Sequence, residues 1–195
     1  MNNAKGFSLI ELLIASAVGL LAIGIVGSVF LSGHNAANKR SLELMLQQDV
    51  NDALRSIKED VLRAGYVSGG SSSLKISGAS KTVYINPSNN CLAYTYQDKT
   101  GTQKYYSIYY KDENKIVYKE LSSAVDTTTA CSVSYANSLI YEKSIKVTDF
   151  NISSEVVSSS SATSQYITIA LTAEVKNNPS ISTEKVIKVK IRNWQ

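Results

Sequence analysis

The chain has 195 residues, with 20 Lys and Arg, 16 Asp and Glu and a formal net charge of +4. This length allows one membrane helix and one further domain of roughly 130 residues, so a second large domain is not expected. The basic residues are interspersed with acidic ones along the sequence and no nucleic-acid-binding motif is present, which argues against a dedicated nucleic-acid reader.

The first distinctive segment is an apolar run from Phe7 to Leu31, in which Glu11 is the only formally charged residue. Its 25 residues exceed the roughly 20 that an α-helix needs to cross a bilayer. A charge inside such a helix costs roughly 3 kcal/mol or more, so a carboxylate there points to a function. Lys5 precedes the run, and the positive-inside rule then places residues 1–6 in the cytoplasm and the remainder of the chain outside.

The start of this run carries a motif in which the small residue precedes the apolar segment, whereas a secretory signal has its small residues after it. Gly6-Phe7-Ser8-Leu9-Ile10-Glu11 resembles the type III signal of the type IV pilin superfamily. The resemblance implies that a prepilin peptidase cleaves between Gly6 and Phe7, that Phe7 becomes the N-methylated first residue, and that residues 1–6 are a leader peptide. The alternative is a single-pass anchor with a chance glutamate.

The same resemblance implies that Glu11 acts in assembly. In the superfamily this carboxylate pairs with the amine of a neighbouring subunit's first residue. The energetic cost of burying the charge is offset only when the two subunits have the axial register that allows this pairing. Secretion pseudopilins at the extreme tip characteristically lack it, so its presence indicates a position inside an initiating complex. The apolar run also lacks the proline common in major pilins, which favours a minor pilin or pseudopilin.

Residues 32–64 are expected to continue the helix as an amphipathic segment. Apolar residues recur at three- and four-residue steps, and charged residues fill other positions. The apolar positions are Leu42, Met45, Leu46, Val50, Ala53, Leu54, Ile57, Val61 and Ala64. Gly65 suits a helix end. The sequence therefore predicts one helix from about residue 7 to 64, with residues 7–31 as its transmembrane half and an apolar stripe that needs a covering surface.

Residues 65–195 are expected to form a β-rich domain. Segments rich in β-branched and aromatic residues alternate with turn signals, first as an antiparallel meander and then as longer strands. The expected strands are 82–85, 91–96, 104–110, 115–119, 144–157, 165–176 and 184–194. A long amino-terminal helix packed on such a domain is an α+β arrangement, and it matches the type IV pilin fold.

Cys91 and Cys131 are the only cysteines, and both fall in the part of the chain expected to be periplasmic. An oxidising compartment permits a disulfide, which would contribute roughly 4 kcal/mol by the loop-entropy estimate. Two free thiols are the alternative. A bridge would tie the meander to the Ser- and Thr-rich segment 122–134.

Seven of the twelve tyrosines cluster between residues 94 and 118 of the meander. In a strand with period two, Tyr106 and Tyr110 lie on one face, whereas Tyr105 and Tyr109 lie on the other. We expect that the tyrosines on the two faces do not all serve only as hydrophobic core. The outward set would serve either cross-strand packing or contact with a neighbouring subunit or ligand.

Catalytic constellations are absent from the sequence. His34 is the only histidine and has no Cys or carboxylate cluster at metal-ligand spacing, so neither a metal site nor a Ser-His-Asp triad is expected. The serine run 158–161 is interpreted as loop. We expect no enzymatic activity and no cofactor.

Residues 57–66, at the end of the helix, are similar to a segment of minor pilins of the PilW and PpdB type and of their type II secretion relatives of the GspJ type. The resemblance implies a structural subunit that helps initiate a type IV pilus. The alternatives are a type II secretion pseudopilin and a tip adhesin or DNA-binding minor pilin, and a major pilin is the competing assignment. Implied partners are other minor pilins, the major pilin, the prepilin peptidase and the inner-membrane assembly platform protein. The chain would sit in the inner membrane before assembly and in a surface pilus afterwards.

Overall fold

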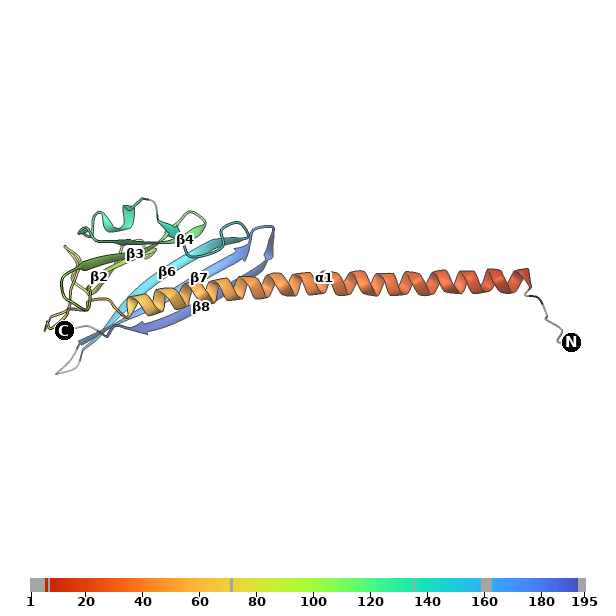
Figure 1. Ribbon diagram of the computed structural model, residues 1–195, viewed down its shortest axis with the longest axis horizontal. Helices are drawn as coiled ribbons and strands as arrows, with labels where there is room; N and C mark the ends of the chain where they lie inside the picture. The colour runs from red at the N-terminus through yellow and green to blue at the C-terminus, as the bar shows by residue number, and fades with distance from the viewer. Residues whose placement is uncertain (1–5, 7, 71, 135, 159–162, 193–195) are drawn as a thin grey trace. The chain divides into compact units, whose positions relative to one another are not determined.

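The computed structural model describes residues 6, 8–70, 72–134, 136–158 and 163–192, which hold a long helix and two antiparallel β-sheets (Figure 1). The chain divides into two compact units, Met1–Leu42 and Glu43–Gln195. Helix α1 (Leu9–Val61) contributes its amino-terminal part to the first unit. Its carboxyl-terminal part belongs to the second unit, together with both sheets.

In the first unit, α1 is apolar and its side chains are exposed throughout the segment that the sequence assigns to a membrane. Leu13 is 59% exposed and Leu9 is 77% exposed, and the other large apolar side chains up to Leu31 lie between these values. The helix is long and apolar enough to cross a bilayer. Because water would solvate such a surface poorly, this part of α1 requires lipid or protein around it.

Helix α1 ends at Val61, three residues before the predicted end. The amides of Arg63 and Ala64 bond to carbonyls three residues earlier, at 2.9 and 3.1 Å, so the last turn tightens out of the α-helical pattern. Gly65 follows with a φ of +76°, and its amide bonds to the Thr95 carbonyl at 2.9 Å. The glycine therefore ends the helix, as predicted, and also attaches the helix end to the sheet.

The first sheet is a five-stranded antiparallel meander in the order β1-β2-β3-β4-β5. Its strands are β1 (Val83–Ile85), β2 (Cys91–Gln97), β3 (Lys104–Asp112), β4 (Lys115–Leu121) and β5 (Asn137–Ser138). Four of these strands were predicted from the sequence, and β5 was not. A short 3-10 helix, η1 (Ala130–Ser132), precedes β5.

The second sheet has three long strands, β6 (Ile145–Ser158), β7 (Thr163–Val175) and β8 (Asn178–Lys190), in that order. The predicted start of the last strand at Glu184 is wrong, because β8 begins six residues earlier. Pro179 lies inside it, next to a register shift between Val175 and Glu174 of β7. Since β8 is an edge strand with a bulge at this point, a residue without an N–H is accommodated there.

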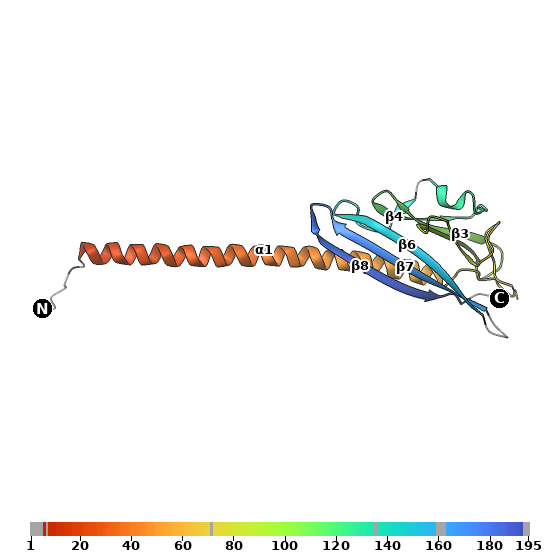
Figure 2. The ribbon, with the colours of Figure 1, turned by 180° about the vertical axis from the view of Figure 1, so that it is seen from behind.

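The main core of the second unit lies between α1 and the two sheets, and Figures 1 and 2 show α1 passing beside β7 and β8 from opposite sides. The predicted apolar stripe is confirmed from Leu46 onward, because all six of its members from that residue to Val61 are at most 2% exposed. The inward residues of the second sheet are buried as well, among them Phe150, Ile152, Ile167, Ile169 and Leu171. Alternate burial along β7 follows the period of two expected for a sheet with one covered face.

A second, smaller core covers the opposite face of the five-stranded sheet. Its buried members are Ile76, Cys91, Ala93, Ile108, Val125 and Ala130. Tyr106 and Tyr110 pack against it, whereas Tyr109 faces α1 and is 1% exposed. The segment containing Val125 and Ala130 folds back over the outer face, but Tyr106 and Tyr110 stay only half-buried there, which agrees with the expectation that the two tyrosine faces are not core alone.

Side chains and turns close most of the sheet edges. Gln165 of β7 accepts a hydrogen bond from the Val83 amide (3.1 Å) and donates one to the Val83 carbonyl (2.9 Å), so its amide group takes the place of a neighbouring strand beside β1. On β6, the amides of Val147 and Ile152 donate to the carbonyls of Asn114 and Asn89, both at 2.7 Å. These bonds also join the two sheets.

Candidate functional site

Gly6 and Ser8 lie on either side of the predicted methylation site and precede α1, which begins at Leu9. Gly6 is exposed, and a Cβ built on it would meet nothing within 4 Å. The described local fold therefore does not demand glycine at this position, and its role in cleavage stays a prediction. The predicted methylation site, Phe7, lies outside the described residues.

Glu11 lies in the first turn of α1 and forms a capping box with Ser8. The Ser8 amide donates to the Glu11 carboxylate at 2.9 Å, and the Ile10 amide donates to the Ser8 hydroxyl at 3.3 Å. Each bond satisfies a backbone donor that the helix itself leaves unpaired. The carboxylate also suits the positive end of the helix dipole. Ser8 was missed as a functional residue, although Ser-x-x-Glu before an apolar run is a known signature of a helix start.

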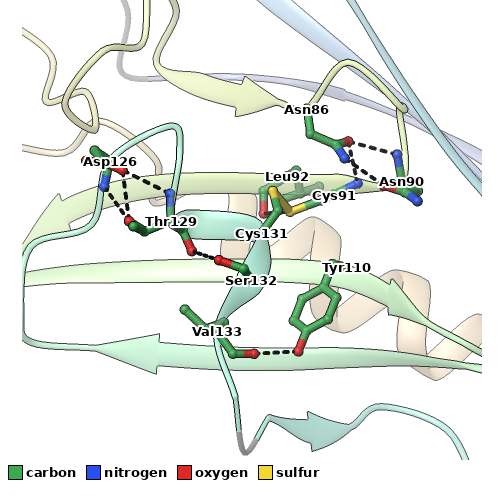
Figure 3. The surroundings of a disulfide bond; sticks show 10 residues. All are labelled: Asn86, Asn90, Cys91, Leu92, Tyr110, Asp126, Thr129, Cys131, Ser132 and Val133. Atoms are coloured by element: carbon green, nitrogen blue, oxygen red, sulfur yellow. Dashed lines mark hydrogen bonds between the residues drawn. A yellow bond between two sulfur atoms is a disulfide. The ribbon is translucent and has the colours of Figure 1, made fainter.

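Cys91 and Cys131 form a disulfide with an S–S distance of 2.07 Å and a Cα–Cα distance of 6.0 Å (Figure 3). Cys91 begins β2 and is 1% exposed, whereas Cys131 lies in η1. The bridge thus joins the outer face of the five-stranded sheet to the segment that covers it. The same segment is held by the Tyr110 hydroxyl, which donates to the Val133 carbonyl at 2.7 Å.

Asp126 organises the turn that leads into η1. Its carboxylate accepts four hydrogen bonds, from the amides and hydroxyls of Thr128 and Thr129, at 2.7 to 3.0 Å. These donors, with the Thr128 hydroxyl contributing most, lower the pKa of Asp126 to about 2. The carboxylate is therefore ionised at any pH at which the domain is expected to work.

A cluster of tyrosines, acids and one arginine joins the end of α1 to the inner face of the five-stranded sheet. Tyr109 donates a hydrogen bond to Asp60, which also pairs with Arg63 at 2.5 Å. Arg63 donates to the Tyr96 hydroxyl at 3.0 Å, and its guanidinium lies 4.5 Å from the centre of the Tyr96 ring. The Tyr96 hydroxyl in turn donates a hydrogen bond to the Glu120 carboxylate at 2.6 Å.

Burial raises the pKa of several of these tyrosines. It is the main cause for Tyr94, Tyr96 and Tyr109, and it raises the pKa of Tyr118, with the added effect of Glu120, to about 12. The Tyr94 hydroxyl is fully buried and has no hydrogen-bond partner among the described residues. This cluster could not be predicted from the sequence, because its members come from α1, β2, β3 and β4 and no spacing along the chain unites them.

His34 is an exposed residue of α1. Among the described residues, no three His, Cys, Asp or Glu side chains are grouped so that they could hold a metal ion.

Comparison with known proteins identifies two matching family models. Residues 39–191 match the family described as prepilin peptidase-dependent protein B, and residues 1–27 match the prokaryotic N-terminal methylation motif. No curated protein matches the chain significantly.

Among solved structures, the chain is similar to a type IV-like pilin, TTHA1219, from Thermus thermophilus, with a TM-score of 0.50 and 9% sequence identity. The similarity covers 76% of this chain and 97% of the other. At this identity the likeness shows the fold alone, and it agrees with the α+β pilin fold expected from the sequence. The chain therefore belongs to the prepilin peptidase-dependent protein B family, carries a prokaryotic N-terminal methylation motif and has a type IV pilin-like fold.

Proposed function

We propose that the chain is a minor pilin, a structural subunit that helps initiate assembly of a type IV pilus and is incorporated near its tip. The observation that carries this proposal is an exposed apolar helix with a carboxylate in its first turn, joined to a separately compact domain. Such a helix can move from lipid into a bundle of similar helices without changing its own fold.

In this proposal residues 1–6 are a leader that the prepilin peptidase removes between Gly6 and Phe7, and Phe7 is then N-methylated. The Glu11 carboxylate is held by the Ser8 amide in the single chain, at 2.9 Å. On assembly it pairs with the amine of a neighbouring subunit's first residue. The local bond keeps a costly charge satisfied until that partner arrives, and the pairing then favours one docking depth.

The proposed partners are the major pilin, other minor pilins and the inner-membrane assembly platform protein. The chain starts in the inner membrane with residues beyond the apolar run in the periplasm, and it ends in a surface pilus. The disulfide agrees with an oxidising compartment. The pilin family is a structural family and is generally not enzymatic.

The test is a deletion strain complemented with full-length variants. We expect deletion to reduce the number of surface pili seen by electron microscopy, and Glu11→Ala to be cleaved and membrane-inserted but absent from sheared pili. Leu12→Ala, which removes an exposed apolar side chain next to Glu11, is the matched control and should assemble normally. Normal recovery of the Glu11→Ala chain in pili would contradict the proposed role of Glu11.

Two further measurements separate the alternatives. Mass spectrometry of the mature chain should find N-methylated Phe7 as its first residue, and Gly6→Val should leave the chain uncleaved. A deletion strain with normal pili but a defect in secretion would instead identify a type II secretion pseudopilin. Normal pili with lost adhesion or DNA uptake would identify a binding subunit.

A further inference from the structure

Two adjoining grooves lie at the carboxyl-terminal end of α1, with volumes of ≈ 460 and ≈ 480 Å³. The first is lined by residues that follow the helix and by the end of β2, including Tyr66 and Tyr96. The second is lined by the end of α1 and of β8. Leu62 and Arg192 belong to both, so the two form one continuous surface, which we call the basic groove.

The lining of the basic groove is strongly cationic. Six of its residues are basic and one is acidic, although the sequence disperses them over more than 130 positions. The cations are Lys58, Arg63, Lys99, Lys188, Lys190 and Arg192. Arg63 pairs with Asp60, and Lys188 pairs with Glu155 at 3.4 Å. Among the described residues, the other four cations form no ion pair, so the groove keeps an excess of positive charge.

Asp98 is the one acidic residue of the lining, and its carboxylate stabilises the turn in which it lies. Its carboxylate accepts hydrogen bonds from the Thr100 hydroxyl at 2.6 Å and from the amides of Thr102 and Gln103 at 2.9 and 3.2 Å. These bonds occupy the carboxylate within its own turn. Among the described residues Asp98 forms no ion pair with Lys99 or Arg192, and its single negative charge leaves the six cations of the lining in excess.

The floor of the basic groove is apolar. Its accessible apolar groups are Leu62 and the ring of Tyr66, which is 37% exposed, and beneath them lie the buried side chains of Val189 in β8 and of Ile191 just after it. A ligand that fits must therefore carry both negative charge and apolar groups. An acidic amphipathic protein segment has this composition, with carboxylates for the cationic rim and aliphatic side chains for the floor.

A single-stranded nucleic acid fits the groove less well. Such ligands need aromatic rings with a free face on which bases stack. Tyr96 is 8% exposed, and its ring already contacts the Arg63 guanidinium at 4.5 Å and the Tyr105 ring at a centroid distance of 5.4 Å. Only Tyr66 among the lining rings is substantially exposed.

We propose that the basic groove binds an acidic amphipathic segment of a neighbouring subunit. This inference rests on the proposed function, because a neighbouring subunit is present only if the chain assembles into a pilus. It adds a second contact between subunits to the one proposed for Glu11. Because the groove lies in the second unit and Glu11 in the first, the two contacts are separated along the chain and can be tested independently.

The first test measures binding by fluorescence anisotropy with the detergent-solubilised full chain. The probe is a short labelled peptide with equal numbers of Glu and Leu, compared with a Glu-only peptide of the same charge and with an oligodeoxythymidylate of the same charge. We expect the Glu-Leu peptide to bind most tightly, and its affinity to fall with rising salt. Tighter binding of the oligonucleotide, or no binding of any probe, would overturn the proposal.

Charge-reversal variants locate the site. Lys190→Glu with Arg192→Glu should weaken binding of the Glu-Leu peptide by about tenfold or more. Lys143→Glu with Lys176→Glu changes the net charge equally at exposed positions outside the groove, and it should leave the affinity within about twofold. An equal loss of peptide affinity in the two double variants would show that the net charge of the chain alone attracts the peptide, and it would overturn the assignment to the groove.

The second test uses living cells, with Tyr66 replaced by a photo-cross-linking phenylalanine derivative in the full chain. We expect a cross-link to an acidic peptide of another membrane-anchored pilin-like subunit, its loss in the Lys190→Glu, Arg192→Glu background, and its return when the cross-linked acids are changed to Lys. Failure of that charge exchange would overturn the inference. If deletion abolishes pili while the charge-reversed chain assembles normally, the groove inference fails and the proposed function stands.

Discussion

The Tyr109 hydroxyl, on the inner face of the five-stranded sheet, donates a hydrogen bond to the Asp60 carboxylate at the end of α1. Asp60 also pairs with Arg63, which in turn contacts Tyr96. The end of the helix is therefore attached to the sheet by a chain of charge-assisted contacts as well as by apolar packing, and this fixes the helix end more specifically than burial alone would.

Removing one hydroxyl from this cluster should measure its contribution. Tyr109→Phe keeps the buried ring but leaves Asp60 with one donor fewer, so we expect the free energy of unfolding to fall by about 1–2 kcal/mol. Tyr141→Phe is the matched control, since its side chain is 54% exposed, and it should change stability by less than about 0.5 kcal/mol. Chemical denaturation of the detergent-solubilised chain checks both, and equal effects would mean that the cluster contributes no more than a surface hydroxyl.

The packing of α1 on the second unit gives a sharper contrast between two residues of the same helix. Ile57 is 0% exposed, and Ile57→Ala should lower the free energy of unfolding by about 2–5 kcal/mol, because it removes buried apolar surface and leaves a cavity. Leu44→Ala truncates a side chain that is 66% exposed and should cost less than about 1 kcal/mol. Similar losses in the two variants would argue that the observed face of α1 is not the one packed in solution.

The disulfide should stabilise the outer face of the first sheet. Cys91 and Cys131 are 40 residues apart, and breaking the bridge is expected to cost up to about 4 kcal/mol by the loop-entropy estimate. Limited proteolysis should then cut first within residues 122–134, which the bridge holds over the sheet. The Cys91→Ser, Cys131→Ser variant should behave like the reduced wild type and should not respond to added reductant. A digestion pattern that reduction leaves unchanged would contradict this role.

Asp126 should make stability depend on pH in the acid range. Its pKa is lowered from 3.8 to about 2 in the folded chain, so its ionised form stabilises the fold above about pH 4, and this contribution is lost as the pH falls towards 2. Asp126→Asn keeps the shape but removes the charge. We expect its denaturation midpoint to lie below that of the wild type at neutral pH, and the two to converge between about pH 4 and 2.

The control for this prediction is Asp149→Asn, which removes an exposed carboxylate from β6. It should leave the denaturation midpoint at neutral pH nearly unchanged. A wild-type advantage over Asp126→Asn that persists undiminished at pH 2 would mean that hydrogen-bond geometry, and not ionisation, supplies the effect.

The elements with a strong local pattern could be predicted from the sequence. The apolar stripe from Leu46 to Val61, the helix stop at Gly65 and the strands of the meander follow from periodicity and turn residues, which act over a few positions. The start of β8 was misplaced because Asn178-Pro179 reads locally as a turn. Only the pairing of β8 with β7, and its place at the sheet edge, make a strand acceptable there.

The candidate functional residues also divide into those that a local sequence motif indicates and those that only the tertiary structure brings together. Gly6, Phe7 and Glu11 belong to a contiguous motif that can be seen in the sequence, and their roles stay predictions, whereas the capping contact of Ser8 could have been found from the Ser-x-x-Glu pattern. The tyrosine cluster and the basic groove could not, since each unites side chains from α1 and from distant strands. Lys58 and Lys190 become neighbours of one groove only when β8 is placed beside the helix end.

The closed sheet edges have a consequence for solubility. Open edges of sheets recruit strands from other molecules and lead to aggregation. Here the side-chain amide of Gln165 caps β1, the turns at Asn89 and Asn114 bond to β6, and β5 has only two residues. Among the described strands, β8 is the long edge that stays open, and it carries Pro179 and three lysines that discourage strand addition. These features hinder the addition of strands from other molecules at the described edges of both sheets, which favours association through the other surfaces of the domain.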